Sequence, residues 1–311
     1  MSPATSPMIN AGWGERFGGW IRVFPEGFSR SRNVVGGVDT GRVGNPELHF
    51  LGHSTVRVEL AGHTVLTDPL LTPRVGPLRR VVPAPDPSTW AGVDLVLISH
   101  LHGDHLHLPS LRLLGPDVRI AVPRGAGEWL RARGFRHVVE VLPGEGFTHG
   151  ALHVTAVPAH HTGHRWGPRL THGPDTRAVG HLVEGAGQTL YVSGDTGLFD
   201  EMHLLGERGL DVALLPVWGW GPTLGPGHLD PDGAAEATAR LRPRVAVPVH
   251  WGTLALPGHR VLPGLRGRMR PLLTEPPRAF AAAVRALGLA THVAVTEPGQ
   301  PVVLAAPTGT A

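Results

Sequence analysis

The segment His100-Leu101-His102-Gly103-Asp104-His105 places three imidazoles and one carboxylate within six residues. It follows Asp94-Leu95-Val96-Leu97-Ile98-Ser99, a run of β-forming residues that ends in a small polar side chain. This pattern is typical of a buried strand that leaves a sheet and enters a loop. Neutral imidazole and carboxylate suit zinc, manganese and iron. A solvated histidine-rich loop is the alternative, but the spacing is uncommon, and we predict a site for two metal ions.

The composition excludes several other chemistries. The chain has 311 residues, 41% of them hydrophobic, and contains no cysteine, so a metal site must use His, Asp and Glu. It also lacks lysine, which excludes Schiff-base catalysis and a phosphate-loop lysine. The formal net charge of +3 is too small to indicate a polyanionic partner, so no nucleic acid is expected.

Targeting signals are not evident in the sequence. No run approaches the roughly 18 to 20 apolar residues of a membrane span, and no export signal is visible at the N-terminus. We therefore expect a cytoplasmic protein, and homo-oligomerisation is left open.

The chain divides into an extension, one catalytic domain and a tail. Residues 1–45 are rich in Gly, Ser, Pro and Arg; they form either an arm over the active-site mouth, a lipid or a partner, or an extension packed on the flank of the domain. Residues 46–306 form one predicted domain and 307–311 the tail. The domain alternates strands with helices, which indicates a layered α/β or α+β fold. Strands are expected at 55–60, 63–67, 93–99, 118–122, 137–142, 153–158, 190–193, 212–216 and 245–249, and helices at 108–114, 125–133, 231–241 and 277–287.

Further ligands are sought where polar residues follow strand-like runs, because side chains at strand ends can meet although they are distant in sequence. The run 154–158 leads to His160 and His161. The run 190–194 leads to Asp195, and the run 245–249 leads to His250.

In order, these residues resemble the metallo-β-lactamase fold superfamily of binuclear hydrolases. The closer resemblance is to the branch that contains N-acylphosphatidylethanolamine-hydrolysing phospholipase D, and the ascorbate-6-phosphate lactonase group is more distant. Besides the metal motif, the resemblance rests on phrases in the family's order: Gly52-His53-Ser54-Thr55-Val56, Leu66-Thr67-Asp68-Pro69, Ser193-Gly194-Asp195-Thr196-Gly197, His228-Leu229-Asp230-Pro231 and His250-Trp251-Gly252-Thr253.

The resemblance implies a four-layer αββα sandwich with two metal ions at one edge, zinc by default, although manganese or iron fits the same ligands. Alignment alone selects His161 over His160. The implied first ion is held by His100, His102 and His161, the second by Asp104, His105 and His250, and Asp195 bridges both.

Three further residues have roles that the resemblance suggests. Asp68 would orient the metal loop from behind the ligands, or it simply begins a turn before Pro69. His228 would stabilise an oxyanion or protonate the leaving group, or it serves the loop. His53 would face the pocket or make a structural hydrogen bond.

The predicted activity is hydrolysis by a hydroxide held between the two ions, with Asp104 and His228 as the catalytic side chains. The expected substrate is a small or lipid-like anionic molecule with a phosphodiester or another phosphate-bearing ester. A lactonase, a thioesterase or a metal-bound sensor without turnover is the alternative.

Overall fold

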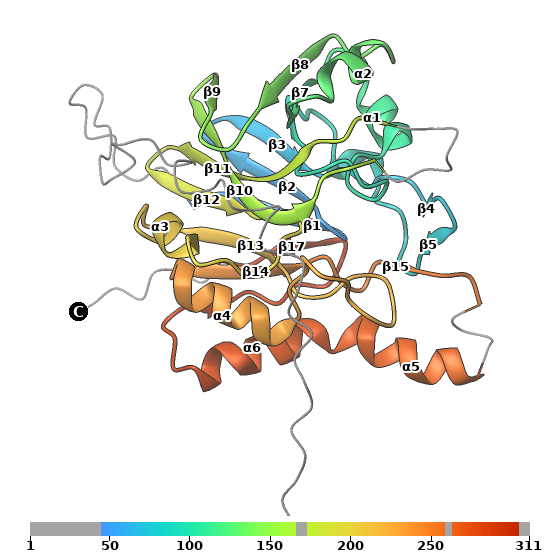
Figure 1. The fold of residues 1–311 in the computed structure, drawn as a ribbon, viewed down its shortest axis with the longest axis vertical. Helices are drawn as coiled ribbons and strands as arrows, with labels where there is room; N and C mark the ends of the chain where they lie inside the picture. The colour runs from blue at the N-terminus through green and yellow to red at the C-terminus, as the bar shows by residue number, and fades with distance from the viewer. Residues whose placement is uncertain (1–44, 166–172, 259–262, 305–311) are drawn as a thin grey trace, which may run out of the picture.

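The computed structural model describes residues 45–165, 173–258 and 263–304. These residues form two seven-stranded sheets that face each other, with helices on both outer sides (Figure 1). The main apolar core includes Phe50 and Val58 of the first sheet together with Val154 and Leu182 of the second. This arrangement confirms the predicted layered α/β sandwich. The predicted N-terminal extension, apart from Asn45, and the predicted tail lie outside the described residues.

The first sheet has the strand order β17-β1-β2-β3-β6-β7-β8. Helices α1 and α2 cover it, and Leu111 and Leu130 of these helices pack with Ile98 and Ile120 in a separate apolar cluster. Its strands are β1 (Glu47–Gly52), β2 (Thr55–Leu60), β3 (His63–Thr67), β6 (Leu95–Leu97), β7 (Arg119–Pro123), β8 (His137–Val141) and β17 (Gln300–Val302).

The second sheet has the order β16-β14-β13-β12-β11-β10-β9. Its strands are β9 (Gly146–His149), β10 (Leu152–Thr162), β11 (Arg177–Gly185), β12 (Gln188–Val192), β13 (Val212–Pro216), β14 (Val245–Val249) and β16 (His292–Val293). A small third sheet, in the order β15-β5-β4, consists of β4 (Arg74–Val75), β5 (Leu78–Arg80) and β15 (Leu254–Ala255).

Helix α4 begins where local signals place its start. Asp230 caps α4 by accepting a hydrogen bond from the amide of Gly233, and Pro231 occupies the first turn, as the sequence predicts. The helices are α1 (Leu108–Leu114), α2 (Gly127–Arg131), α3 (Met202–Gly206), α4 (Pro231–Leu241), α5 (Pro263–Thr274) and α6 (Pro276–Ala286), with a 3₁₀ turn at Pro87–Thr89. None of the helices in these ranges has the length and apolar content of a membrane span.

Several strands differ from the prediction, and two of them, β10 and β11, bear on the site. β11 was not expected, because Gly180 and His181 interrupt its apolar pattern. A Cβ at Gly180 would lie 3.0 Å from the carbonyl oxygen of Val192, so the tight pairing of β11 with β12 favours glycine there. β10 continues four residues beyond its predicted end at Pro158, with a register shift between Pro158 and Thr162. His161 therefore lies inside a strand and not after it.

The strand directions bring the candidate site residues to one edge of the sandwich. β3 and β6 run parallel, so Asp68 and the segment 100–105 leave the first sheet together. β12, β13 and β14 also run parallel, which places Asp195 and His250 at the corresponding edge of the second sheet. β10 and β12 are both antiparallel to β11, so His161 lies at this edge as well.

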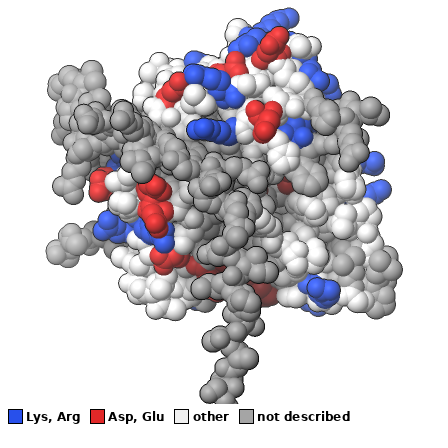
Figure 2. Space-filling model, viewed as in Figure 1, with Lys and Arg blue, Asp and Glu red and all other residues white. Residues whose placement is uncertain are grey.

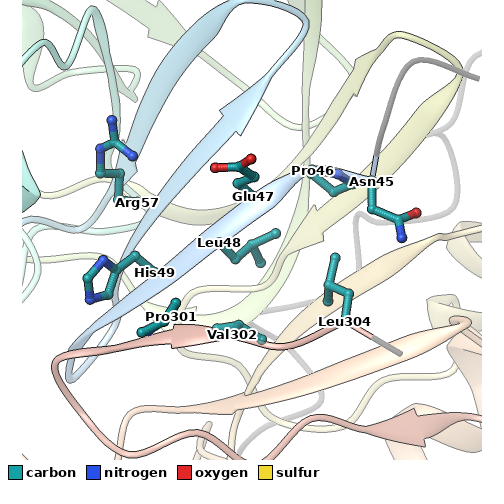
Figure 3. A pocket seen from close by; sticks show the side chains of 9 residues that line it. All are labelled: Asn45, Pro46, Glu47, Leu48, His49, Arg57, Pro301, Val302 and Leu304. Carbon is teal, nitrogen blue, oxygen red and sulfur yellow. The ribbon is translucent and has the colours of Figure 1, made fainter. Parts of the chain in front are cut away.

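Other surface features lie away from this edge. A cavity of about 350 Å³ lies beside β1 and β17 and is lined by residues that include Glu47, His49, Arg57 and Val302 (Figure 3). None of the candidate site residues lines it. On the face shown in Figure 2, arginine and acidic side chains are interspersed and do not form one basic area.

The buried His181 on β11 predicts acid sensitivity. Its Nε2 has no hydrogen-bond partner, and burial lowers the pKa of His181 to about 4 although Asp68 acts in the opposite direction. The unfolded chain takes up this proton near pH 6.5 and the folded chain only near pH 4, so stability present above pH 6.5 is lost as the pH falls.

The variant His181→Leu cannot take up this proton. From pH 7 to pH 5, its free energy of unfolding is expected to fall by about 2 kcal/mol less than that of the wild type. Urea unfolding with a chelator present measures this, and equal losses contradict it.

Candidate metal centre

The first group of candidate ligands consists of His100, His102 and His161. His102 Nδ1 lies 2.9 Å from His100 Nε2 and 3.2 Å from His161 Nε2, so three ring nitrogens converge on one point. The ring of the neighbouring His160 stacks instead on Phe199, with ring centroids 4.6 Å apart. The structure thus brings His161, and not His160, to the other histidines.

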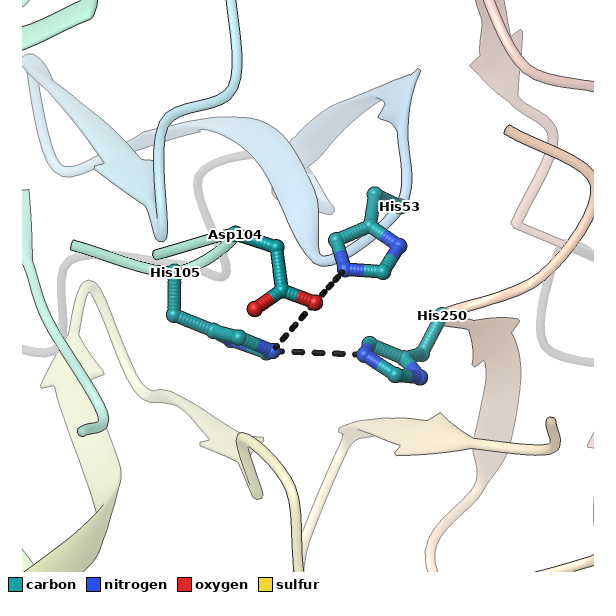
Figure 4. Close-up of side chains that lie close together, drawn as sticks. All are labelled: His53, Asp104, His105 and His250. Carbon is teal, nitrogen blue, oxygen red and sulfur yellow. Dashed lines mark hydrogen bonds and ion pairs between the residues drawn. The ribbon is translucent and has the colours of Figure 1, made fainter. Parts of the chain in front are cut away.

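The second group contains His53, Asp104, His105 and His250, whose side chains point toward one another (Figure 4). His105 Nε2 lies 3.2 Å from His250 Nε2. His53 Nε2 is 2.9 Å from Asp104 Oδ2, and its ring centroid is 4.1 Å from that of His250. His53 is 1% exposed, and its hydrogen bond is made with a candidate ligand.

Asp195 lies between the two groups. It follows β12, and its Oδ2 is 3.3 Å from both His105 Nε2 and His250 Nε2. A carboxylate oxygen of Asp195 also lies within 4.8 Å of a ring nitrogen of His100 and of a ring nitrogen of His161. Its other oxygen, Oδ1, is buried without a hydrogen-bond partner. A buried carboxylate oxygen that nothing satisfies is costly, and a cation at this point would satisfy it.

Each imidazole has an inner nitrogen, which points toward the other candidate ligands, and an outer nitrogen, which points away from them. In four of these rings the outer nitrogen faces an oxygen acceptor. The pairs are His100 Nδ1 with Ser99 Oγ at 3.0 Å, His105 Nδ1 with Asp68 Oδ2 at 2.8 Å, His161 Nδ1 with the Gly227 carbonyl at 2.8 Å, and His250 Nδ1 with the Trp218 carbonyl at 2.7 Å. An outer nitrogen that donates a proton leaves the inner nitrogen with its lone pair. Inner lone pairs that face one another repel unless a cation lies between them. These residues therefore fit divalent metal ions, whose imidazole ligands are held in this way.

The buried charges also require a cation. Asp68, Asp104 and Asp195 are carboxylates, and within the described ranges all their ion-pair partners are histidines. Burial would raise the pKa of Asp195, but the facing His250 and His105 hold it well below its ordinary value. Burial likewise opposes ionisation of Asp104, but the hydrogen bond from His53 together with the charges of His105, His53 and His250 outweighs it, so the pKa of Asp104 is also lowered.

Burial keeps most of the imidazoles neutral, which is the form that binds metal. It lowers the pKa of His102 and His250 to about 3 and lowers the pKa of His100 and His161. His105 is the exception: burial acts in the same direction, but Asp195 and Asp68 outweigh it and hold its pKa well above the ordinary value. The preferred position for positive charge is thus beside His105, between its two carboxylate neighbours.

Backbone strain is concentrated around the second group. His53, Asp68 and His250 have φ angles of 56°, 34° and 63°, in the left-handed region that side chains with a Cβ disfavour. Such conformations cost about 1–3 kcal/mol each and persist only where surrounding contacts enforce them. Here the amide of His250 donates to the carbonyl of His53 over 2.7 Å, so two of the strained residues hold each other.

Asp68 lies behind the metal loop, as its predicted orienting role requires. It accepts hydrogen bonds from the amide of Ser99 at 2.8 Å, from the Ser99 hydroxyl at 2.6 Å and from His105 Nδ1 at 2.8 Å. The carboxylate is 1% exposed. It therefore fixes both the start of the loop and the direction of one imidazole.

His228 stands at the open side of the site. Its Nε2 is 3.5 Å from Asp195 Oδ2, its Nδ1 faces the Gly225 carbonyl at 3.1 Å, and its ring packs edge-on to His161. Burial lowers the pKa of His228, but the hydrogen bond with Asp195, the charge of Asp195 and the hydrogen bond with the Gly225 carbonyl together outweigh it and leave the pKa above the ordinary value. With a side chain 22% exposed, His228 can meet both solvent and the candidate ligands.

A separate group at the other end of the sheets has the same residue types but the opposite hydrogen bonding. His63 and His149 both contact Asp94, at 3.3 and 3.1 Å. Their outer nitrogens, however, face donors: the amide of Ala151 and a guanidinium nitrogen of Arg119, each at 3.3 Å. Neutral rings so arranged carry their protons toward the carboxylate, so this group fits a hydrogen-bonded link between the sheets better than a metal site.

Comparison with known proteins agrees with this geometry. The β-lactamase superfamily domain matches residues 63–251. A metal-dependent hydrolase of Opitutus terrae is 34% identical over 81% of this chain and 97% of its own length. An N-acyl-phosphatidylethanolamine-hydrolyzing phospholipase D of Caenorhabditis elegans is 31% identical over 66% of this chain and 63% of its own length.

Solved structures show the same fold. A metallo hydrolase from the archaeon Ignicoccus hospitalis superposes with a TM-score of 0.63 and 26% identity, over 83% of this chain and 97% of that one. The family match, which includes the metal loop, Asp195 and His250, and the hydrolase relatives together identify the protein: it is a metal-dependent hydrolase of the metallo-β-lactamase fold superfamily.

Proposed function

We propose that the chain is a dinuclear hydrolase that cleaves a phosphodiester or another phosphate-bearing ester. The observation that carries the proposal is the convergence of two ligand groups on one carboxylate, Asp195, whose Oδ1 has no other partner. The proposed first ion is held by His100, His102 and His161. The second is held by Asp104, His105 and His250, with Asp195 shared.

The side chains around the ions have separate tasks. Bound divalent ions supply Lewis acidity and activate water for hydrolysis, so no serine nucleophile is needed. Asp68 keeps the outer proton on His105 Nδ1 and its inner nitrogen free. His53 holds Asp104 by its Nε2. His228 Nε2, on the open side, is placed to donate a proton to the leaving group or to a developing oxyanion.

The substrate class is proposed from one relative. The phospholipase D relative from Caenorhabditis elegans acts, by its name, on a phosphodiester of a lipid, and it covers two thirds of this chain. We therefore propose an anionic, lipid-like or smaller phosphate ester as the substrate. Zinc is the proposed metal because histidine and carboxylate are its ligands here, and manganese or iron fits the same set.

A substrate panel tests the proposal. The protein, loaded in turn with zinc, manganese and iron, is assayed on bis(p-nitrophenyl) phosphate, an N-acylated phosphatidylethanolamine, an acyl lactone and a thioester. Turnover of a phosphodiester by protein that carries two ions is the expected result. A fully loaded protein that cleaves only the lactone or the thioester overturns the substrate class, and one that is inert to all four overturns the proposed activity.

A matched pair of variants tests the first ligand group. His161→Ala is expected to lose one bound ion, because the ring nitrogen of His161 is 3.2 Å from His102 Nδ1. The neighbouring His160→Ala is expected to keep both ions, because that ring stacks on Phe199. Elemental analysis of the purified proteins gives the ion count per chain. Loss of metal from His160→Ala with retention in His161→Ala would reverse the assignment.

A further inference from the structure

Three backbone segments hold the second ligand group, and each contains one strained residue. His53 lies in the turn between β1 and β2, Asp68 follows β3, and His250 follows β14. Because their positive φ angles are unfavourable, these residues need outside support to keep their directions. The small sheet β15-β5-β4 lies beside these segments (Figure 1), and its strand β5 ends in Arg80.

The guanidinium nitrogens of Arg80 donate hydrogen bonds to backbone carbonyl oxygens. One nitrogen donates to the Leu51 carbonyl at 2.7 Å, another to the Leu70 carbonyl at 2.9 Å, and Nε to the Pro83 carbonyl at 3.3 Å. Burial lowers the pKa of Arg80 to about 10. The planar guanidinium donates to carbonyls of two separate segments at once, and a lysine side chain is not equivalent in this role.

The hydrogen bond from Arg80 to the Leu51 carbonyl lies close to His53, because only Gly52 separates Leu51 from His53 in the chain. A Cβ at Gly52, whose φ is +110°, would lie 2.8 Å from the Arg80 guanidinium and 2.9 Å from Thr253 Oγ1. Thr253 Oγ1 in turn accepts the amide proton of His53 at 2.7 Å. Arg80 and Thr253 therefore both pack against the turn that aims His53 at Asp104.

The hydrogen bond from Arg80 to the Leu70 carbonyl is linked to Asp68, and the pairing of β5 with β15 links Arg80 to the segment that contains His250. The amide of Leu70 donates to Thr55 Oγ1 at 2.9 Å, and that hydroxyl donates to the carbonyl of Asp68 at 2.8 Å. Arg80 itself pairs with Leu254 of β15, four residues after His250. One side chain and its own strand thus tie all three segments together.

We propose that Arg80 is a positioning residue for the second ion: it clamps the segments that direct His53, Asp68 and His250. The inference rests on the proposed dinuclear site. Arg80 faces the ligands only through backbone, so its loss should weaken the binding of one ion more than that of the other, whose ligands His102 and His161 it does not reach.

The test measures stepwise binding of Co²⁺ to metal-free protein by calorimetry and by the visible spectrum of the bound ion. Arg80→Met is expected to raise one of the two dissociation constants about ten- to hundredfold and to change the spectrum of that ion. Arg80→Lys, which can reach one carbonyl, should fall between Arg80→Met and the wild type. The exposed neighbour Arg79→Met is the control and should match the wild type.

A double-variant cycle separates positioning from general destabilisation. If Arg80 acts through His53, then Arg80→Met in a His53→Ala background should add little to the loss of affinity. Should Arg80→Met fold poorly, Thr253→Val, which removes the acceptor of the His53 amide, is expected to give the same selective loss. Equal weakening of both ions, no change, or full additivity with His53→Ala overturns the inference. A wild type that binds only one ion overturns the dinuclear proposal itself.

Discussion

Asp195→Asn is expected to lower kcat/KM by about a thousandfold or more and to leave fewer than two ions per chain. The substitution keeps the shape of the side chain and removes its charge. Asp195 Oδ2 is 3.3 Å from both His105 Nε2 and His250 Nε2, and Oδ1 has no partner, so the carboxylate is the group that both proposed ions share. Elemental analysis and phosphodiester hydrolysis on the same preparation measure the two effects.

The control for this variant is Asp232→Asn, an exposed carboxylate in the first turn of α4. It removes the same charge far from the ligands and should leave both the ion count and kcat/KM unchanged. If Asp195→Asn retained two ions and most of the activity, Asp195 could not be the shared ligand, and the division of the histidines between two ions would have to be redrawn.

His228→Ala is expected to lower kcat by about a hundredfold to ten thousandfold while both ions stay bound. His228 is 3.5 Å from Asp195 but faces the open side of the site, and the proposed ligand sets are complete without it. Its loss should therefore slow proton transfer more than it weakens metal binding. Steady-state kinetics and elemental analysis of the loaded variant measure these effects separately.

The exposed His203→Ala on α3 serves as the matched control, because its ring nitrogen contacts only the nearby Asp200 carbonyl among the contacts described. Loss of an ion from His228→Ala would make His228 a ligand instead of a proton donor. An unchanged rate on every substrate would exclude His228 as the proton donor.

Local sequence patterns predicted much of the fold. The bounds of β2, β3, β13 and β14 and of α1 and α4 agree with the predicted ranges, because each is a compact apolar run with clear ends. β11 and the three strands of the small sheet were not predicted. β11 carries glycine and histidine where close packing against β12 decides the residues, and strands of two or three residues have no period to recognise.

The sequence by itself determined the chemistry of the site. Histidine and aspartate crowd the loop after one buried strand and follow others, and residue type and strand ends are local properties that a sequence displays. These sufficed to predict metal binding and the edge of the sheet at which the ligands meet, and the order of the motifs gave the resemblance to the superfamily.

Only the tertiary structure decided how each ligand is held. The β10 register shift brings His161, not His160, to His102, and the turn after β1 brings His53 to Asp104. The acceptors that set the imidazole protons include the carbonyls of Trp218 and Gly227, and Arg80 grips two more carbonyls. Every residue has a carbonyl, so its role has no signature in the sequence and arises only when the folded backbone fixes where it points.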